Sequence, residues 1–277
     1  MSLSDPARVT EILEQVAKDE ILPKFKALQD AEVQRKNSGE LVTVADVAAE
    51  RAISRELTAL LPGSQVVGEE GVEADPRMLE ALREDAPVWL IDPIDGTGNF
   101  ANGRPVFAVM VALVRAGETQ AAWILDPISG DTAIAERGAG AFMAGRRLKV
   151  QPASTPEAMQ GTLHAGQFAS PSMHRHIKTR RDRLNTLRTM SCAGAEYIRL
   201  VTGEMQFSFF TKMKPWDHAP GGLIHWEAGG VGMTLDRQPY APAKTHRPGL
   251  LLAPDQASWD YLFQTLFGDT ELGSLAE

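Results

Sequence analysis

The sequence predicts a mixed α/β protein, and three patterns along the chain carry that prediction. Apolar residues recur at helical spacing between residues 9 and 61. Short apolar runs separated by turns follow between residues 106 and 135, as in an antiparallel meander. Strand-like and helix-like segments alternate in the second half, which favours an α/β arrangement. With 277 residues, 43% of them hydrophobic, the chain can bury a sizeable core in one large domain or two intimate lobes.

Two helices are expected in the N-terminal part of the chain. Asp5 and Pro6 are typical of an N-cap followed by proline at the first helical position, and Pro23 should end or kink that helix. A second helix is predicted over about Val44–Leu61, because Pro62-Gly63 stops the helical pattern there.

Short strands are expected next. Val66-Val67 forms an apolar piece that ends at Gly68, and Glu69 and Glu70 should continue it in extended conformation, with side chains on opposite sides. Further along, the pattern predicts a short helix at Leu79–Arg83, a buried strand at Val88–Ile91, and meander strands at Val106–Val114, Thr119–Leu125 and Thr132–Ala135.

The stretch Gln151–Pro156 is rich in turn-forming residues and predicts a lobe boundary. We expect an N-terminal α+β lobe over residues 1–150 and a C-terminal α/β lobe over residues 151–277. In the second lobe, strands are predicted at Thr162–His164, Gln206–Phe210 and Leu250–Ala253. Helices are predicted at Pro171–Leu187, Glu196–Thr202, His218–Ala228 and Trp259–Phe267.

Composition and charge narrow the class of protein. The formal net charge of -8 implies no broad basic face, which argues against binding of a nucleic acid polymer. Cys192 is the single cysteine, so an intrachain disulfide and a thiolate zinc site are excluded and a reducing compartment is favoured. The polar start Met1–Asp5 does not resemble a signal peptide, and no apolar stretch is long enough to span a bilayer. We therefore expect a cytoplasmic protein with no membrane partner.

The segment Asp92-Pro93-Ile94-Asp95-Gly96-Thr97 is the most informative in the chain. Asp92 and Asp95 end a buried apolar run, and carboxylates three residues apart at a strand end can converge on one hard cation. The Gly96-Thr97 turn that follows offers backbone N–H groups to an anion. An Asx turn would explain either aspartate alone, but the whole string is more specific than a turn requires. We interpret it as a site for metal-assisted phosphate chemistry.

Three further acids stand beside turns or prolines. Taken alone, Glu69 and Glu70 fit a solvated loop, and Asp217 fits the N-cap of a helix that starts at His218. Carboxylates gathered within about 5 Å would repel by roughly 3 kcal/mol per pair at an effective dielectric near 20, and divalent cations remove that repulsion. All-oxygen ligands favour Mg²⁺ or Mn²⁺ over zinc, and a pair of such ions can activate water and stabilise a leaving oxygen.

Together these segments resemble the inositol monophosphatase family of Mg²⁺-dependent, lithium-sensitive phosphatases. The matching segments occur in the family's order from about Leu41 to Asp236: Leu41-Val42-Thr43 with Asp46, Gly68-Glu69-Glu70, Asp92 to Thr97, Gly138 to Phe142, Trp216-Asp217 and Glu227 to Gly230. The resemblance implies a layered α/β/α/β/α sandwich of the sugar phosphatase type, in a protein that is often a homodimer.

The resemblance also implies the metal ligands. Glu69, Asp92 and the carbonyl of Ile94 would bind one Mg²⁺ ion. Asp92, Asp95 and Asp217 would bind a second, and Glu69 would hold a weaker third ion through water. Mn²⁺ is an alternative to Mg²⁺ at the same oxygen ligands.

The same resemblance implies the catalytic and phosphate-binding residues. Thr97 and Glu70 would position and activate the nucleophilic water, and Asp46 would hold the Thr97 hydroxyl in place. The N–H groups of Gly96 and Thr97 would cradle the phosphate.

The departures from the family pattern concern the substrate. Inositol-selective members usually carry an acid seven residues before the Trp-Asp aspartate, and here that position is Phe210, which accepts no hydrogen bond from a hydroxyl. Glu196, on the helix that approaches the substrate in the family, could replace part of that function. Lys212 and Lys214 either bind a second anionic group or are simply exposed. The basic run His174–Arg183 favours a solvated helix face over an anion site.

We therefore expect a Mg²⁺-dependent phosphomonoesterase that acts on a small phosphorylated metabolite, such as inositol monophosphate or a sugar phosphate. Fructose 1,6-bisphosphate, 3′-phosphoadenosine 5′-phosphate and histidinol phosphate are alternative substrates. A non-catalytic sugar-phosphate binding member of the fold is the alternative outside the enzymes, and a two-metal nuclease is disfavoured by the negative charge.

Overall fold

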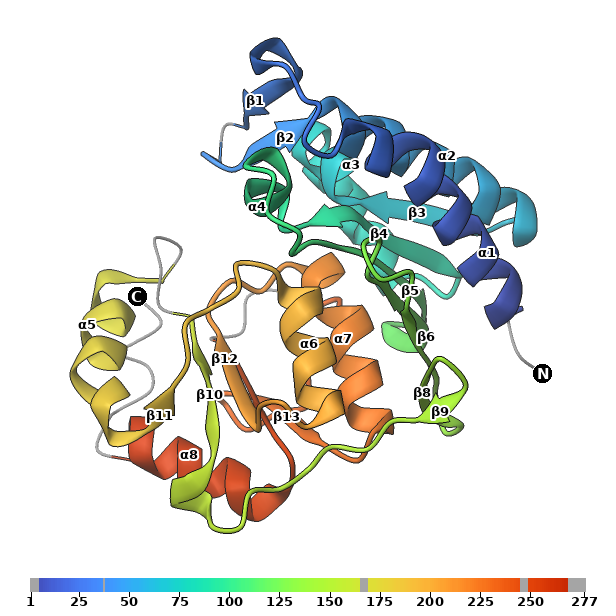
Figure 1. Ribbon diagram of the computed structural model, residues 1–277. Coiled ribbons are helices and arrows are strands. Elements are labelled where there is room, and N and C mark those ends of the chain that lie inside the picture. The colour runs from blue at the N-terminus through green and yellow to red at the C-terminus, as the bar shows by residue number, and fades with distance from the viewer. Residues whose placement is uncertain (1–4, 37, 165–168, 245–248, 269–277) are drawn as a thin grey trace.

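The computed structural model describes residues 5–36, 38–164, 169–244 and 249–268, and helices and sheets alternate through it as layers (Figure 1). Helices α1 and α2 cover a seven-stranded sheet, α6 and α7 separate it from a five-stranded sheet, and α5 and α8 cover the far side. This α/β/α/β/α order is the predicted one. Within the described ranges, no helix is both long and apolar enough to cross a membrane.

The seven-stranded sheet has the order β3-β4-β5-β6-β7-β8-β9. Its strands are β3 (Gln65–Gly68), β4 (Val88–Asp95), β5 (Ala108–Arg115), β6 (Glu118–Leu125), β7 (Thr132–Glu136), β8 (Gly140–Met143) and β9 (Arg146–Arg147). Strands β3 and β4 are parallel, and each later pair is antiparallel. The predicted antiparallel meander is confirmed, and β8 and β9 extend it beyond the predicted strands.

The five-stranded sheet has the order β11-β10-β12-β14-β13, with β10 parallel to both of its neighbours and β14 antiparallel to both of its own. Its strands are β10 (Gln160–Leu163), β11 (Asn185–Thr186), β12 (Phe207–Phe210), β13 (Val231–Thr234) and β14 (Leu250–Ala253). A separate hairpin, β1 (Val33–Arg35) with β2 (Leu41–Thr43), lies beside α4 and was not predicted (Figure 1).

The α-helices are α1 (Pro6–Val16), α2 (Val44–Leu60), α3 (Glu69–Ala74), α4 (Thr97–Ala101), α5 (Pro171–Arg180), α6 (Ala193–Thr202), α7 (Pro215–Glu227) and α8 (Gln256–Phe267). Asp5 caps α1 as predicted, since its carboxylate accepts the N–H of Ala7 at 3.1 Å. A π-helical turn, Ala17–Ile21, and a 3₁₀ turn, Leu22–Lys24, carry the chain past α1 to Pro23. The short helix expected at Leu79–Arg83 is 3₁₀ and spans Pro76–Arg83.

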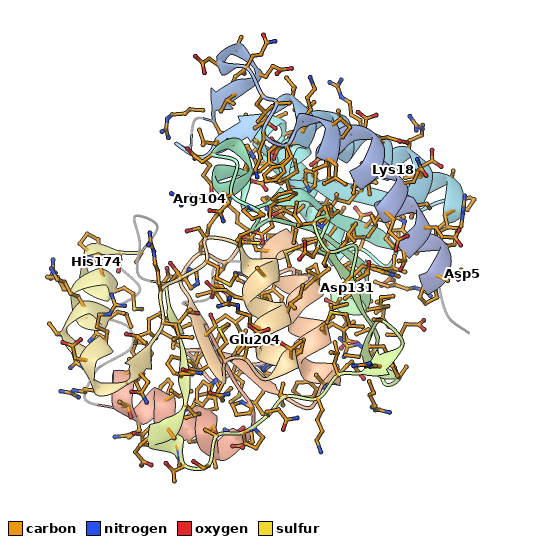
Figure 2. The ribbon with its side chains drawn as sticks, in the orientation of Figure 1. Asp5, Lys18, Arg104, Asp131, His174 and Glu204 are labelled. Carbon is orange, nitrogen blue, oxygen red and sulfur yellow. The ribbon has the colours of Figure 1, made fainter. Side chains whose placement is uncertain are left out.

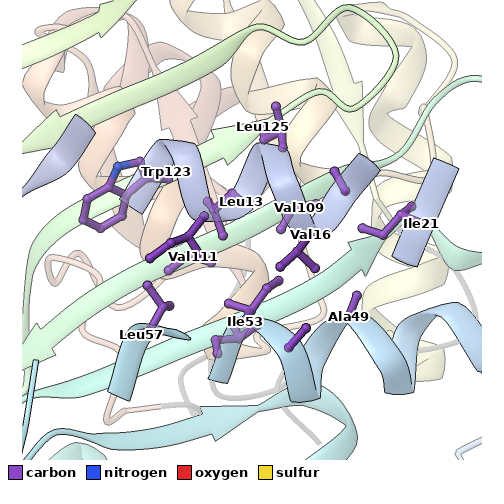
Figure 3. Close-up of a cluster of buried hydrophobic side chains, with 14 of the residues drawn as sticks. Leu13, Val16, Ile21, Ala49, Ile53, Leu57, Val109, Val111, Trp123 and Leu125 are labelled. Atoms are coloured by element: carbon purple, nitrogen blue, oxygen red, sulfur yellow. The ribbon is translucent and has the colours of Figure 1, made fainter. Parts of the chain in front are cut away.

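The first core lies between the N-terminal helices and the larger sheet (Figure 3). Leu13 of α1 and Ile53 of α2 pack against Val111 and Trp123, and all four side chains are fully buried. The apolar faces that helical spacing gives α1 and α2 pack here against the apolar face that alternation gives the strands. Ile91 of β4 belongs to the same core, and the end of β4 carries the Asp-Pro-Ile-Asp segment.

A second core joins the two halves of the chain. Met110 and Ile124 of the larger sheet share one buried cluster with Tyr197 of α6 and Ile224 of α7. The two sheets divide in the connection between β9 and β10, where the boundary between residues 150 and 151 was predicted. The halves therefore share a core, and their separation into two domains stays a prediction.

Three local predictions were wrong. Helix α5 ends at Arg180 and not at Leu187, because Asn185-Thr186 leaves the helical path to pair with β10. Helix α7 begins at Pro215, whose fixed φ suits the first helical position, so Asp217 lies in its first turn and is not its N-cap. Glu69 and Glu70 open α3 and do not continue β3, which places their side chains on the same side of the chain and not on opposite sides.

Candidate active site

An irregularity in β4 brings Asp92 and Asp95 to the same face of the sheet. In a regular strand, side chains three residues apart point to opposite faces. Here Asp92 lies opposite Met110 and Asp95 lies opposite Ala108, so three steps along β4 match two steps along β5. This bulge turns both carboxylates toward the layer of α6 and α7. Pro93 lies inside the bulge, where a missing N–H is tolerated.

The turn after β4 needs a glycine. Gly96 has φ +88°, and a Cβ there would lie 3.0 Å from the carbonyl oxygen of Val106. The turn then starts α4 at Thr97. The Asp92 carboxylate accepts the N–H of Ile94 at 3.1 Å, which is the Asx turn that the sequence also allowed. The turn and the candidate site are therefore the same piece of structure.

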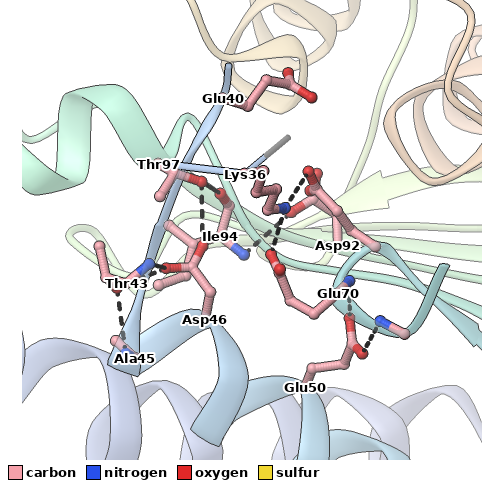
Figure 4. Close-up of polar contacts among 12 residues, drawn as sticks. Lys36, Glu40, Thr43, Ala45, Asp46, Glu50, Glu70, Asp92, Ile94 and Thr97 are labelled. Carbon is pink, nitrogen blue, oxygen red and sulfur yellow. Dashed lines mark hydrogen bonds and ion pairs between the residues drawn. The ribbon is translucent and has the colours of Figure 1, made fainter. Parts of the chain in front are cut away.

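Buried Asp46 holds the hydroxyl of Thr97 (Figure 4). The Thr97 Oγ1–Asp46 Oδ1 distance is 3.1 Å, and Thr97 also donates to the carbonyl of Ile94 at 2.9 Å. The other carboxylate oxygen of Asp46 accepts the N–H and hydroxyl of Thr43, at 2.8 and 2.6 Å, in the capping box of α2. Burial raises the pKa of Asp46 to about 6, although hydrogen bonds from Thr43 and Thr97 oppose that shift.

Asp95 connects the two halves of the chain. Its Oδ2 accepts the backbone N–H of Gly194 at 2.6 Å and the thiol of Cys192 at 3.1 Å, both at the start of α6. Burial raises the pKa of Asp95, and these hydrogen bonds oppose the shift. Asn99 makes a parallel connection, because its amide donates to the carbonyls of Val106 and Met190, each at 2.9 Å.

Lys36 joins the two adjacent glutamates (Figure 4). Its ammonium lies 2.8 Å from Glu69 Oε1 and 2.7 Å from Glu70 Oε1, and its side chain is 3% exposed. Burial alone would lower the pKa of Lys36, but the two carboxylates raise it well above its ordinary value. Glu50 supports this turn from α2, since its carboxylate accepts the N–H groups of Glu70 and Gly71 at 2.8 and 2.9 Å.

Asp217 enters the site from α7. It is buried, and its carboxylate lies 3.8 Å from the ammonium of Lys212. Lys212 is also ion-paired with Glu40, which belongs to the turn before β2. Burial would lower the pKa of Lys212, whereas Asp217 and Glu40 raise it above its ordinary value. The pair of Glu40 and Lys212 therefore bridges the two halves of the chain.

Several of these residues line one cavity of about 920 Å³, whereas Lys36, Asp46 and Glu70 are outside its described wall. Its wall includes the predicted ligands Glu69, Asp92, Ile94, Asp95 and Asp217, together with Gly96 and Thr97. Burial, followed by the charges of Glu69, Asp95 and Asp217, raises the pKa of Asp92 well above its ordinary value. Burial raises the pKa of Asp217 as well, with Asp95 and Glu69 adding to the shift against Lys212. The carboxylates therefore lie close enough to repel one another.

The donor set fits a hard divalent cation in its chemistry. Every donor is a carboxylate or carbonyl oxygen, which suits Mg²⁺ or Mn²⁺. In the part of the chain that the structure describes, no three acidic, histidine or cysteine side chains form a ready metal-binding group. The ammonium groups of Lys36 and Lys212 instead lie against Glu69, Glu70 and Asp217 and supply the compensating charge.

Comparison with known proteins agrees with this arrangement. The model of the inositol monophosphatase family matches residues 5–265. The chain belongs to the inositol monophosphatase family. Membership implies a phosphatase, a hydrolase of phosphate esters.

Individual members of the family support the assignment. An inositol-1-monophosphatase of Rhizobium meliloti is 33% identical over 209 residues, which cover 74% of this chain and 76% of that protein. The Nus factor SuhB of Vibrio cholerae is 32% identical over 215 residues, covering 74% and 77%. The solved structure of an IMPase from Thermotoga maritima has a TM-score of 0.76 at 24% identity, covering 92% of this chain and 95% of that one. This last likeness establishes the fold.

The substrate side of the cavity differs from what the sequence suggested. Glu196 is fully buried and is not among the described residues that line the cavity. Its carboxylate lies 2.8 Å from Nε2 of His164 and also accepts hydrogen bonds from Thr162 and Ser208. His164 does line the cavity and stacks on Phe210, with ring centroids 4.6 Å apart. Glu196 therefore acts on the cavity through His164 and not by its own carboxylate.

The two predicted lysines have different surroundings. Lys212 lines the cavity but is not simply exposed, because Glu40 and Asp217 hold its ammonium. Lys214 is outside the described cavity wall, and its ammonium lies 5.1 Å from the ring centroid of Trp216. The basic run also differs from the prediction in part, since His174, Lys178 and Arg181 line the cavity while Arg175 is exposed and outside the described cavity wall.

Sequence reasoning missed Lys36, Glu40, Glu50 and His164. Each is a charged or titratable residue that looks ordinary in its own segment, and each acquires its role only when a distant segment packs beside it. One weak pattern existed for Glu50, which follows the capping-box residue Asp46 by one helical turn and so lies on the same face of α2.

Proposed function

We propose that this family member is a Mg²⁺-dependent phosphomonoesterase that hydrolyses a small phosphorylated metabolite, either an inositol monophosphate-like ester or a sugar phosphate. One observation carries the proposal: carboxylates from β4, α3 and α7 line the cavity into which Thr97 also faces, and Thr97 is bonded to buried Asp46. A module that only bound sugar phosphates would gain nothing from a buried aspartate that orients a hydroxyl group.

In this proposal the metal ions lie among the cavity's oxygen donors. Glu69, Asp92 and the carbonyl of Ile94 would hold one Mg²⁺ ion, and Asp92, Asp95 and Asp217 the other. Mn²⁺ could replace either ion, and a third would lie near Glu69. When bound, the ions polarise the phosphate and lower the pKa of water.

The side chains around the turn would prepare the water for attack. Thr97 has a single hydroxyl proton and two acceptors, Asp46 and the Ile94 carbonyl, so it turns a lone pair toward the cavity. That lone pair would accept a hydrogen bond from water and so orient it. Burial raises the pKa of Glu70 to about 7 despite Lys36, which suits a group that takes up a proton near neutral pH.

Phosphate oxygens would accept the N–H groups of Gly96 and Thr97, both of which line the cavity. Water then attacks phosphorus in line with the leaving alkoxide, and the products are inorganic phosphate and an alcohol. No side chain is needed as nucleophile, so no phosphoenzyme is expected.

The identity of the substrate is proposed only as a class. The Rhizobium meliloti relative is named an inositol-1-monophosphatase, which favours a cyclitol or sugar ester. Phe210 is nearly buried and stacks on His164, so it offers no acceptor to ring hydroxyls. 3′-Phosphoadenosine 5′-phosphate and histidinol phosphate therefore stay as alternatives, as does a non-catalytic sugar-phosphate binder. From the same family likeness we also propose lithium sensitivity, a homodimer and a cytoplasmic location.

The test is phosphate release from a panel of phosphorylated metabolites with and without Mg²⁺. We expect Asp92→Asn to lower kcat/KM by at least about a hundredfold, the scale of losing one electrostatic stabiliser. Asp126→Asn is the matched control, because Asp126 opens a similar Asp-Pro-Ile turn, accepts the N–H of Ile128 at 2.8 Å, and is outside the described cavity wall. Light scattering and inhibition by LiCl check the dimer and the lithium sensitivity.

Two results would count against the proposal. If Asp92→Asn and Asp126→Asn keep the same Mg²⁺-dependent turnover, the assignment of the metal ligands is wrong. If the unmodified protein binds phosphate esters but releases no phosphate from any of them, the non-catalytic alternative replaces the enzyme.

A further inference from the structure

The cavity has a basic wall in addition to its acidic one. Lys178 of α5, Arg181 of the next 3₁₀ turn and Arg188 of the following loop all line it. His174 of α5, labelled in Figure 2, lines it as well. These four residues come from a single segment between β10 and α6. The acidic residues of the cavity come from other elements, β4, α3, α7 and the turn before β2.

Helix α5 has three distinct faces. Met173, His176 and Ile177 are buried in the core between the five-stranded sheet, α5 and α8, where His176 stacks on Phe267, and Ile177 also reaches the cavity wall. His174 and Lys178 are one turn apart and face the cavity, and Arg181 continues that row at the next turn. Arg175 is exposed and is outside the described cavity wall. The cavity-facing charges can therefore be changed separately from the solvent-facing ones.

Lys178, Arg181 and Arg188 form no ion pair with a carboxylate of the residues that the structure describes. Among the described residues, neither Lys178 nor Arg188 forms an ion pair or a side-chain hydrogen bond. Asp182 is the single acidic residue between positions 171 and 190. The helix dipole accounts for a lysine in the last turn of α5, but it gives no reason for Arg188, which lies outside any helix.

We propose that Lys178, Arg181 and Arg188 form a distal anion subsite, and that the substrate is a small metabolite with a second phosphate group besides the ester that is hydrolysed. This inference rests on the proposed function and narrows its substrate class. The acidic wall takes the metal ions and the ester phosphate, and the basic wall takes the phosphate at the other end of the molecule. Guanidinium groups bind phosphate through two parallel hydrogen bonds, which fits the two arginines.

The volume of the cavity and its stacked aromatic lining agree with a substrate that carries a phosphate group at each end. Its volume of about 920 Å³ is near the upper end of the usual range for small-molecule sites. His164 and Phe210 also line the cavity, and their stacked rings offer a largely apolar surface to the body of the substrate. A neutral polyol ring would leave Lys178, Arg181 and Arg188 without an anionic partner.

The experiment compares matched esters with and without the second phosphate. The pairs are fructose 1,6-bisphosphate with fructose 1-phosphate, and 3′-phosphoadenosine 5′-phosphate with adenosine 3′-phosphate. We expect at least one bisphosphate to exceed its partner in kcat/KM by about tenfold or more, the scale of one hydrogen bond to a charged group. In Lys178→Gln/Arg188→Gln that preference should vanish through a higher KM, with kcat and monophosphate kinetics unchanged.

The matched control is Arg175→Gln/Arg183→Gln, which removes the same charge from the same segment outside the described cavity wall. It should keep the preference at equal ionic strength. Calorimetric titration of Thr97→Val with the same esters gives a second readout, in which the bisphosphate binds about tenfold more tightly until Lys178 and Arg188 are changed.

Three outcomes would overturn the inference. The first is hydrolysis of monophosphates with no preference for either bisphosphate, which leaves the proposed function intact. The second is a preference that survives Lys178→Gln/Arg188→Gln. The third is an equal loss in the Arg175→Gln/Arg183→Gln control, which would indicate a general electrostatic field. Absence of hydrolysis for every ester would instead refute the proposed function, and the calorimetric comparison would still decide the subsite.

Discussion

Two threonines donate hydrogen bonds to the same buried carboxylate, but only one of their substitutions should impair activity. Thr97 donates to Asp46 Oδ1 at 3.1 Å and lines the cavity. Thr43 donates to Asp46 Oδ2 at 2.6 Å, is buried at the start of α2, and is outside the described cavity wall. Replacement by valine keeps the shape of either residue and removes only its hydroxyl. We predict that Thr97→Val abolishes most of the activity and that Thr43→Val does not.

The losses of stability should be of similar size. Thr97→Val loses hydrogen bonds to Asp46 and to the Ile94 carbonyl, for about 1–3 kcal/mol. Thr43→Val loses its bond to Asp46 and its cap on the N–H of Ala45, for about 2–4 kcal/mol. Loss of a group that positions water should lower kcat by roughly 10²–10⁴-fold, and only Thr97 has that role.

The assay measures kcat and KM for Mg²⁺-dependent phosphate release together with the urea-unfolding free energy of each variant. Thr97→Ser serves as the conservative variant, since it restores the hydroxyl, and it should recover most of the activity. Equal losses of kcat in Thr97→Val and Thr43→Val, or near-normal turnover in Thr97→Val, would show that the Thr97 hydroxyl is structural and that the proposed water-positioning role is wrong.

Three further predictions concern stability. Lys36→Met leaves Glu69 and Glu70 without their buried counter-ion, so calorimetry should show the metal-free protein losing about 3–5 kcal/mol of unfolding free energy, part of which Mg²⁺ restores. In the control Lys24→Met, which removes a lysine side chain that is 42% exposed in its ion pair, the loss should be under about 1 kcal/mol. Gly221→Ala places a Cβ 2.0 Å from the Tyr197 ring between α6 and α7, and urea unfolding should show a loss of about 3 kcal/mol or more. In the neighbouring control Gly222→Ala the new Cβ lies 3.7 Å from Tyr240, so this variant should be neutral or stabilised. Burial lowers the pKa of His225 from 6.5 to about 4, so the unfolded state takes up the proton first and the unfolding free energy should fall by up to about 3 kcal/mol as the pH drops from about 6.5 to 4. Thermal unfolding of His225→Phe should show a shallower decline with falling pH, and an unchanged slope would refute the role of His225.

The site residues that could be predicted from sequence are those that stand close together in one short segment with a recognisable pattern. Asp92, Asp95 and Thr97 stand in one short string, so their neighbourhood in space follows from their neighbourhood along the chain. The meander and the first helices were equally accessible, because a hydrophobic period of two or of 3.6 is a local property.

Partners supplied by distant segments could not be predicted. Lys36 reaches Glu69 and Glu70 across 33 and 34 positions of sequence, and no feature of its own turn distinguishes it from a surface lysine. The burial of Glu196 could not be predicted either. Its helix was predicted, but the hydrogen bonds from Thr162 and Ser208 that draw its carboxylate inward depend on the pairing of β10 with β12.

The turns at Asp92 and Asp126 show where local chemistry stops being informative. Both read Asp-Pro-Ile, and in both the aspartate accepts the N–H of the isoleucine. Asp126 follows the end of β6, away from that strand's own register shift near Thr119, and opens the loop before β7. Asp92 lies within a bulged strand whose face is covered by α7, so its carboxylate meets those of Asp95 and Asp217 in a buried place. The difference between a turn and a candidate metal centre is therefore set by one extra residue in β4 and by the helix that packs over it.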